Sequence, residues 1–260
     1  MPTTTVPPSP RRASRMTMLC AALALFGAQA AFGQTDAGPR DADALKRLTQ
    51  MGDYLRSLKS FTLKAQTTKD EVLESGQKLQ FAGTLQYQFA APDKLRASLR
   101  SDRQWRDFYF DGKTATMLAP RMGYYTSVPV QGSVGDLMTQ LASKYDIEMP
   151  LADLFFWGSK ASGLDELQSA TLVGPARIDG RDCDHFALRQ PGVDWQIWVE
   201  RGARPLPCKL VITTTENPSQ PQYSAVLNWQ LAAPPAAASF TYQPTKDAKR
   251  IEIAAVPGAN

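Results

Sequence analysis

The chain has 260 residues, of which 43% are hydrophobic and 21% charged, and its formal net charge is +4. That length suits one large domain whose folding buries about 70% of the surface exposed by the unfolded chain. Three of the 29 basic residues and no acidic ones lie in residues 1–33, so residues 34–260 carry 26 basic against 25 acidic side chains. This near balance of charge argues against nucleic acid or an anionic membrane surface as a partner.

Residues 1–33 have the pattern of an export signal. Basic residues up to Arg15 precede the apolar run Met16 to Phe26, and small residues suited to cleavage follow up to Gly33. The apolar run is too short to span a bilayer, and no later segment approaches twenty unbroken apolar residues. We therefore expect a cleaved signal peptide over 1–33, a periplasmic location, and no transmembrane segment in the mature chain, residues 34–260.

A helix is expected from Asp41 onwards, because acidic residues at its start suit the positive end of the helix dipole. Apolar residues then recur with the 4, 3, 4, 3 spacing of one helical stripe: Ala44, Leu48, Met51, Leu55 and Leu58. Such a helix has one dry face, so we expect it to pack on a sheet.

Alternation of apolar and polar residues follows, which predicts antiparallel strands with one dry and one wet face. It covers about 61–66, 78–89 and 94–100, and it is longest between Leu79 and Phe89. These strands are the first part of the predicted sheet.

A tight hairpin is expected over Trp105 to Leu118, because Asp111-Gly112 supplies two residues that tolerate the positive φ of a type I′ turn. Phe108, Tyr109 and Phe110 place aromatic rings on both faces of this hairpin. Part of its outer face must therefore be covered, and we expect the next helix, 133–145, to cover it.

Two apolar helices are predicted between the two runs of strands. Ser133 and Asp136 have the spacing of a capping box, and an apolar stripe follows up to Tyr145. Pro150 opens a second helix over 151–157, which is apolar nearly all round and therefore buried or in contact with a ligand. The two helices would form a lid across an open sheet; the alternative is a pair of ordinary core helices.

Strands resume after residue 169 and continue almost to the end of the chain. Asp179-Gly180 predicts a second type I′ hairpin, and alternation returns at Trp195 to Val199 and at Tyr223 to Leu231. About ten or eleven strands and three helices predict an α+β fold, in which a large curved antiparallel sheet forms a half-open β-barrel. We expect one such domain over residues 34–260, covered by the N-terminal helix and two lid-like helices.

Cys183 and Cys208 are the cysteines that follow the leader, in a compartment that permits disulfides. If 183–189, 194–200 and 207–215 form a meander, the two cysteines lie on strands separated by a third. They are then about 10 Å apart, whereas a disulfide needs Cα atoms within about 7 Å. This spacing favours two buried thiols over a disulfide, although a strongly coiled edge would close the gap.

The sequence contains no constellation typical of catalysis or metal binding. His185, the single histidine, follows Asp184 within a strand, so the two side chains point to opposite faces and do not form part of a triad. Ser133 lacks the glycine pattern of a nucleophile elbow, and one histidine with two distant cysteines does not build a zinc site. We therefore expect no enzyme activity, no cofactor and no metal.

The strongest remaining signal is apolar. If the sheet curves too widely for its inner side chains to meet, they line a cavity that needs an apolar guest; in a closed small barrel they fill the core. The residues expected to line the cavity are Phe81, Leu85, Tyr87, Phe89, Leu95, Leu99, Trp195, Ile197 and Trp229. The residues expected to form the lid are Leu137, Met138, Leu141, Leu154, Phe155, Phe156 and Trp157.

Several short motifs occur along the chain: Phe61 after an N-terminal helix, a strand leading to Pro92, Asp111-Gly112-Lys113-Thr114 followed by Pro120, and Phe240-Thr241-Tyr242-Gln243-Pro244. In their order and spacing they resemble the lipoprotein carrier superfamily (LolA/LolB/LppX-like). Three further motifs are Met149-Pro150-Leu151-Ala152-Asp153-Leu154, Cys183-Asp184-His185 and Arg204-Pro205-Leu206-Pro207. With these, the chain more closely resembles a family of predicted periplasmic proteins, domain of unknown function 2092.

The resemblance implies a half-open barrel, closed by helices around an apolar cavity. Ala91 stands where the lipoprotein chaperone of that superfamily has an arginine that holds its lid shut, so the gating mechanism is not implied. We therefore expect a periplasmic, non-enzymatic binding or carrier protein for a lipid, a lipoprotein acyl chain or another hydrophobic ligand. The alternative is an envelope protein-interaction or stress-sensing module on the same scaffold, with a protein partner and no bound lipid.

Overall fold

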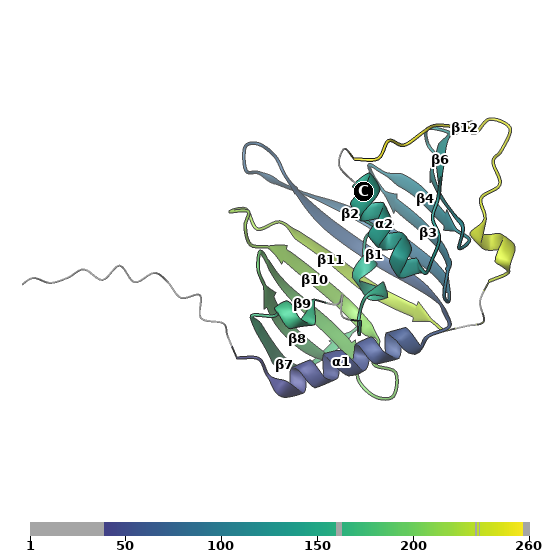
Figure 1. Ribbon diagram of the computed structural model, residues 1–260. Coiled ribbons are helices and arrows are strands. Elements are labelled where there is room, and N and C mark those ends of the chain that lie inside the picture. The colour runs from purple at the N-terminus through teal and green to yellow at the C-terminus, as the bar shows by residue number, and fades with distance from the viewer. Residues whose placement is uncertain (1–38, 160–162, 232, 234, 257–260) are drawn as a thin grey trace, which may run out of the picture. The chain divides into compact units, whose positions relative to one another are not determined.

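The computed structural model describes residues 39–159, 163–231, 233 and 235–256, and the expected signal peptide lies outside them (Figure 1). The described elements belong to one compact unit, Ala37–Asn260. The strands are β1 (Ser60–Val72), β2 (Lys78–Ala90), β3 (Lys94–Ser101), β4 (Trp105–Phe110), β5 (Thr114–Ala119), β6 (Tyr124–Pro129), β7 (Ser169–Ile178), β8 (Arg181–Gln190), β9 (Val193–Glu200), β10 (Pro207–Thr214), β11 (Gln222–Gln230) and β12 (Lys249–Arg250). The helices are α1 (Ala42–Ser57) and α2 (Val134–Tyr145), with the 3₁₀ turns η1 (Ala152–Phe155), η3 (Leu164–Glu166) and η4 (Ala237–Phe240).

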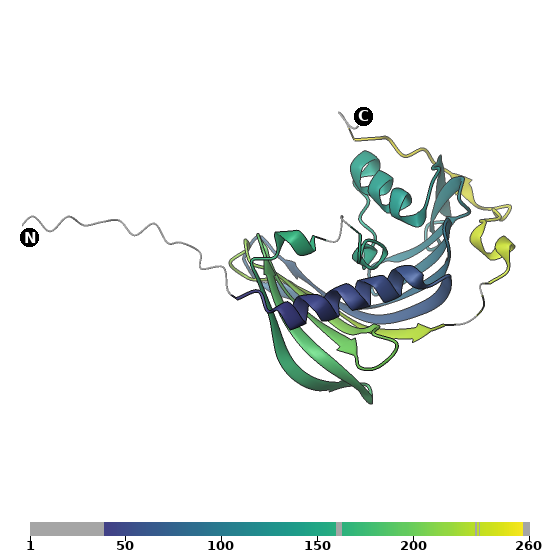
Figure 2. The ribbon, with the colours of Figure 1, turned by 60° about the horizontal axis from the view of Figure 1, so that its bottom comes forward.

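The described strands form one open sheet in the order β12-β6-β5-β4-β3-β2-β1-β11-β10-β9-β8-β7. Its outermost strands do not pair with each other, and the sheet curls around the helices (Figure 2). Leu63 and Ala65 of β1 pair with Tyr87 and Leu85 of β2, and all four are buried on the concave face. The predicted α+β half-open barrel is confirmed, with twelve strands in the described residues.

Helix α1 follows the predicted apolar stripe. Ala44, Leu48, Met51 and Leu55 are buried, and Leu58 is the C-cap. The helix lies against β7 and η1. No helix in the described ranges is long and apolar enough to cross a membrane.

Asp184 of β8 anchors α1 to the sheet. Its side chain is only 7% exposed and forms ion pairs with Arg47 of α1 and, at 2.7 Å, with Nε of Arg201. Two guanidinium groups therefore compensate a buried carboxylate that would otherwise be costly.

Helix α2 begins with the predicted capping box. The Asp136 N–H donates to Ser133 Oγ at 3.2 Å, and the Ser133 N–H donates to Asp136 Oδ2 at 2.8 Å. The second predicted helix, 151–157, is wrong, because the structure has only the 3₁₀ turn η1. Seven residues are too few to sustain an α-helix by their own hydrogen bonds, and Leu151 adopts a left-handed φ of 61°.

The expectation that helix 133–145 covers the outer face is also wrong. Leu137, Met138 and Leu141 of α2 belong to the core on the concave side. The outer face is covered by the C-terminal segment, where the ring of Tyr242 lies 5.5 Å from that of Tyr109. Period-two alternation identifies the two faces of a strand but not the segment that covers each.

The two Asp-Gly dipeptides form different turns. Asp179 and Gly180 both have positive φ, at 47° and 79°, as the type I′ prediction requires. At the first dipeptide only Gly112 has positive φ, so that prediction is wrong. Asp111 Oδ1 instead accepts the N–H of Thr114 at 2.8 Å, which stabilises a three-residue loop.

Cys183 and Cys208 lie much closer together than their strands predicted. Their Sγ atoms are 2.6 Å apart, and both side chains are buried. Pro207 pairs with Val199, but Lys209 already pairs with the preceding residue of β9, which leaves Cys208 as the extra residue of a β-bulge. The bulge turns Cys208 to the outer face beside Cys183, so the separation of about 10 Å expected from regular strand spacing is wrong.

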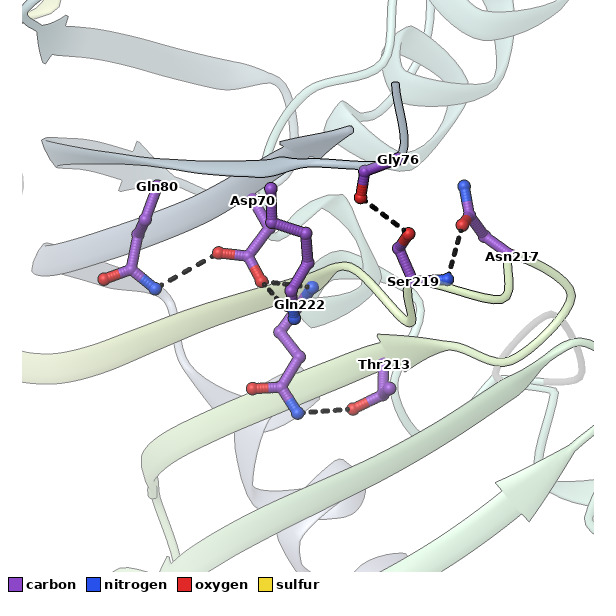
Figure 3. Close-up of polar contacts among 8 residues, drawn as sticks. Asp70, Gly76, Gln80, Thr213, Asn217, Ser219 and Gln222 are labelled. Carbon is purple, nitrogen blue, oxygen red and sulfur yellow. Dashed lines mark hydrogen bonds and ion pairs between the residues drawn. The ribbon is translucent and has the colours of Figure 1, made fainter. Parts of the chain in front are cut away.

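Hydrogen bonds tie two hairpins together at one end of the sheet (Figure 3). Asp70 accepts from Gln80 Nε2 and from the backbone N–H of Gln222, both at 3.1 Å, and Ser219 Oγ donates to the Gly76 carbonyl at 3.0 Å. Burial acts to raise the pKa of Asp70, but the hydrogen bonds outweigh it and the pKa is lowered. The carboxylate form therefore joins the β1–β2 hairpin to β11.

Candidate ligand-binding cavity

A cavity of about 490 Å³ lies between the segment carrying η1 and η3 and the strands β8 to β11. Apolar side chains supply most of its lining, and three polar side chains complete it. The described lining residues are Leu151, Asp153, Leu154, Trp157, Gly163, Glu166, Gln190, Val193, Trp195, Ile197, Pro207, Leu210, Ile212 and Leu227.

The wall of the cavity is built by cross-strand pairs. Trp195 and Ile197 of β9 are two residues apart and therefore share one face. Ile212 of β10 pairs with Trp195, and Leu210 pairs with Ile197. Leu227 of β11 extends this layer, so three neighbouring strands present one apolar surface.

Trp157 and Gln190 connect the segment above the cavity to this wall. The rings of Trp157 and Trp195 meet edge-to-face, with centroids 5.5 Å apart. Trp195 Nε1 donates to Gln190 Oε1 at 2.9 Å, and Gln190 Nε2 donates to the Gly163 carbonyl at 2.8 Å. Because these polar groups satisfy one another, an apolar guest would not leave them without partners.

Asp153 and Glu166 line the cavity without a cationic partner among the residues that the structure describes. Burial raises the pKa of Asp153 above its ordinary value of 3.8, and the negative charge of Glu148 raises this pKa further. A negatively charged ligand group is repelled at this place. A hydroxyl, amide or ammonium group finds a hydrogen-bond acceptor instead.

The other part of the concave face is packed. The Phe155 ring lies 5.6 Å from Tyr87, 5.7 Å from Phe89 and 6.2 Å from Phe61. Tyr87 Oη also donates to the carbonyl of Pro150 at 2.6 Å. Beneath α2, the space left between the helix and β4 to β6 is only about 10 Å³. This part is therefore core, and the hollow beneath α2 is too small for a guest.

A second hollow, of about 590 Å³, lies on β1, β2, β3 and β11. Small and polar side chains such as Thr67, Thr84 and Ser224 dominate it. It is wide open to solvent and lined mostly by short side chains, whereas the cavity beneath η1 is more enclosed and lined by large apolar side chains, so that cavity is the better candidate site for a hydrophobic molecule.

The nine residues expected to line a cavity are divided between the cavity beneath η1 and the packed part of the concave face. Trp195 and Ile197 line the cavity beneath η1. The other seven lie elsewhere: Leu85, Tyr87 and Leu95 are buried in the core, Phe89, Leu99 and Trp229 pack against it, and Phe81 lies under the guanidinium of Arg103. The prediction therefore combined one cavity wall with the packed part of the same face.

The seven expected lid residues are divided in the same way. Leu154 and Trp157 line the cavity. Leu137, Met138 and Leu141 form the buried face of α2, while Phe155 and Phe156 pack against the core.

Several lining residues were missed by the sequence analysis. Leu210 and Ile212 lie in β10, where the bulge after Pro207 breaks the alternation that assigns residues to a face. Asp153 lies in the segment expected to form a regular helix, so its position at a cavity had no sequence signal. The largely apolar stretch 206–212 was the available indication of the β10 part of this wall.

His185 makes the packing and hydrogen-bond contacts of a structural residue. Its ring stacks on Trp198 with centroids 4.1 Å apart, and Nε2 lies 3.0 Å from Gln196 Oε1. Burial lowers its pKa, and Lys209 lowers it further, although the bond to Gln196 opposes this. The residues that the structure describes contain no group of three or more His, Cys, Asp or Glu that would hold a metal ion.

Comparison with known proteins adds a family and several similar folds. A family model described as "Predicted periplasmic protein (DUF2092)" matches residues 44–254. No curated protein matches the chain in sequence. Similar solved structures include lipoprotein LppX of Mycobacterium tuberculosis, at 12% identity over 74% of this chain and 98% of that chain, with a TM-score of 0.47.

Two further structures extend this comparison. LprF of Mycobacterium bovis is 13% identical over 76% of this chain and 100% of that chain, with a TM-score of 0.45. The MucA/MucB complex of Pseudomonas aeruginosa gives 17% identity over 82% of this chain and 64% of that chain, with a TM-score of 0.38. At these identities and scores, none of the three identifies a ligand.

Proposed function

Because the chain belongs to the DUF2092 family of predicted periplasmic proteins, as its motifs predicted, we propose that it is a non-enzymatic periplasmic binding or carrier protein for a hydrophobic ligand. The observation that carries this proposal is the apolar cavity of about 490 Å³ beneath η1. In this proposal, cleavage of a signal peptide over 1–33 leaves the mature chain, residues 34–260, in that compartment.

The cavity volume limits the size of the ligand. A dry cavity of about 150 Å³ holds one benzene molecule, which has six carbon atoms. On that scale, a cavity of about 490 Å³ accommodates roughly twenty non-hydrogen atoms. One acyl chain of about 14 to 16 carbons fits, and its burial contributes on the order of 10 kcal/mol before ordering costs.

The carboxylates at the cavity narrow the class of acyl ligand. Asp153 and Glu166 disfavour a free fatty-acid anion, because like charges repel strongly where water is partly excluded. An ester, amide or amine end is compatible with both. We therefore favour a neutral or cationic monoacyl lipid, or one ester- or amide-linked acyl chain of a lipoprotein.

Co-purification from the periplasm tests this function. The full chain, exported with its own leader, would be weighed by native mass spectrometry and then extracted with organic solvent. We expect one acylated molecule per protein. Ile212→Trp fills the cavity from β10 and should lose that molecule while melting at a similar temperature.

Val173→Trp is the matched control, because Val173 is 55% exposed on β7 and does not line the cavity. It should retain the ligand. A wild-type protein that stays empty after incubation with a monoacylglycerol and with an acylated peptide would contradict the proposal. The envelope protein-interaction or stress-sensing module would then be the better account, and a saturable protein partner would be sought.

A further inference from the structure

Cys183 and Cys208 lie on the outer face of the sheet, behind the strands that form the cavity wall. Cys183 belongs to β8 and Cys208 to β10, and β9 runs between them. Only the bulge at Cys208 brings the two side chains to the same face. Their Sγ atoms are 2.6 Å apart, which exceeds the S–S bond length of about 2.04 Å by little more than half an ångström.

We propose that Cys183 and Cys208 form a disulfide in the exported protein, which fastens β8 to β10 across the end of β9. Each thiol gives up one proton and one electron as the S–S bond forms. The two electrons pass to a disulfide-bearing oxidoreductase of the envelope, whose own disulfide is reduced to two thiols. The reaction therefore needs only an oxidant of the class that an oxidising compartment supplies.

The bond forms before folding is complete. Both cysteines are buried in a small cluster with Trp198 and Val211, so an oxidant cannot reach them in the folded protein. Burial also raises the pKa of Cys183, which keeps the folded thiol from becoming the reactive thiolate. Once formed, the disulfide is protected from reductants by the same burial.

The disulfide fixes one part of the cavity wall. Pro207 lines the cavity, and it is adjacent to Cys208 at the bulge. Holding Cys208 against β8 therefore holds the bulge, and with it the position of Pro207. We expect the disulfide to keep the wall in place when the cavity is empty.

Peptide mapping tests the bond directly. The full chain would be exported to the periplasm, lysed directly into denaturant that contains N-ethylmaleimide near neutral pH, so that any free thiol is alkylated at once, and then digested. We expect a linked pair of peptides containing residues 183 and 208, which separates and becomes alkylated only after reduction. Recovery of both cysteines alkylated without reduction would overturn the proposal, whether or not the protein carries a ligand.

Thermal unfolding gives an independent measurement. The disulfide closes the loop between residues 183 and 208, which should raise the melting temperature. Wild-type protein that is reduced in denaturant and refolded with reductant should therefore melt about 10 °C lower than the oxidised protein. The double variant Cys183→Ala/Cys208→Ala should melt near the reduced wild type and should not respond to reductant. An equal response of both proteins to reductant would count against the bond.

Discussion

Asp153 is the residue through which pH acts on the proposed site. Burial and the charge of Glu148 raise its pKa, so it binds its proton at a higher pH than an ordinary aspartate does. An alkyl sulfonate, which stays anionic, should therefore bind more tightly as the pH falls through that pKa. At neutral pH, Asp153→Asn should bind the sulfonate about fivefold more tightly than wild type, because one repelling charge is removed. Fluorescence of Trp157 and Trp195, which line the cavity, reports the binding.

Two controls separate this effect from a general change of charge. Asp165 lies exposed in the neighbouring turn η3 and does not line the cavity, so Asp165→Asn should leave sulfonate affinity unchanged. A neutral monoacylglycerol should bind the wild type with the same affinity across this pH range. Equal sulfonate affinities in the two variants would show that Asp153 does not face the ligand.

Helix α2 begins at a pair of reciprocal hydrogen bonds between Ser133 and Asp136. Ser133→Ala should lower the free energy of unfolding by about 1 kcal/mol in urea titrations, because an N-cap acceptor is lost. The hydroxyl and N–H of Ser133 lower the pKa of Asp136. The folded pKa is then below the unfolded one, so this stabilisation is present above the ordinary value of 3.8 and is lost as the pH falls through the folded pKa.

Thr139→Ala is the control for this helix, since Thr139 is exposed one turn further along α2. Its effect should stay within about 0.5 kcal/mol at any pH. The difference between the two variants should shrink in acid. A deficit of Ser133→Ala that is the same at neutral and acid pH would show that Asp136 takes no part.

Most of the helices and strands can be predicted from the spacing of apolar residues alone. The stripe from Ala44 to Leu55 and the alternation from Leu79 to Phe89 each allow one orientation, because a shift by one residue would expose the apolar face. The conformation of each turn is not determined by the spacing of apolar residues. The same Asp-Gly pair makes a two-residue turn at 179–180 and a wider loop at 111–112, where Asp111 finds a hydrogen bond to Thr114.

The position of the cavity was not predictable from the strands. Leu85 of β2 and Ile197 of β9 have the same alternating surroundings and both are buried, yet only Ile197 lines the cavity. On the β2 side, the ring of Phe155 packs against Tyr87 and Phe89. Phe155 belongs to a 3₁₀ turn, and so short a segment has no period from which its contacts could be derived.

Across the whole molecule, some residues of the concave face stabilise the fold, and others line the proposed binding cavity. Leu95 of β3 is fully buried, pairs with Phe110 and belongs to the part covered by α2. Ile212 of β10 lines the cavity beneath η1. The two positions lie on opposite sides of β1 in the sheet, so a change at one should not alter the other.

Leu95→Ala should therefore lower the free energy of unfolding by about 3 kcal/mol, as the loss of a buried leucine does, and leave ligand affinity within about twofold of wild type. Ile212→Trp should weaken binding at least about tenfold, because the indole occupies the space of the guest, while stability changes by about 1 kcal/mol or less. The double variant should show both effects in full. Urea unfolding without ligand and fluorescence titration of the folded proteins measure the two quantities separately. A large loss of affinity in Leu95→Ala would mean that the ligand lies under α2 after all, as the sequence analysis expected.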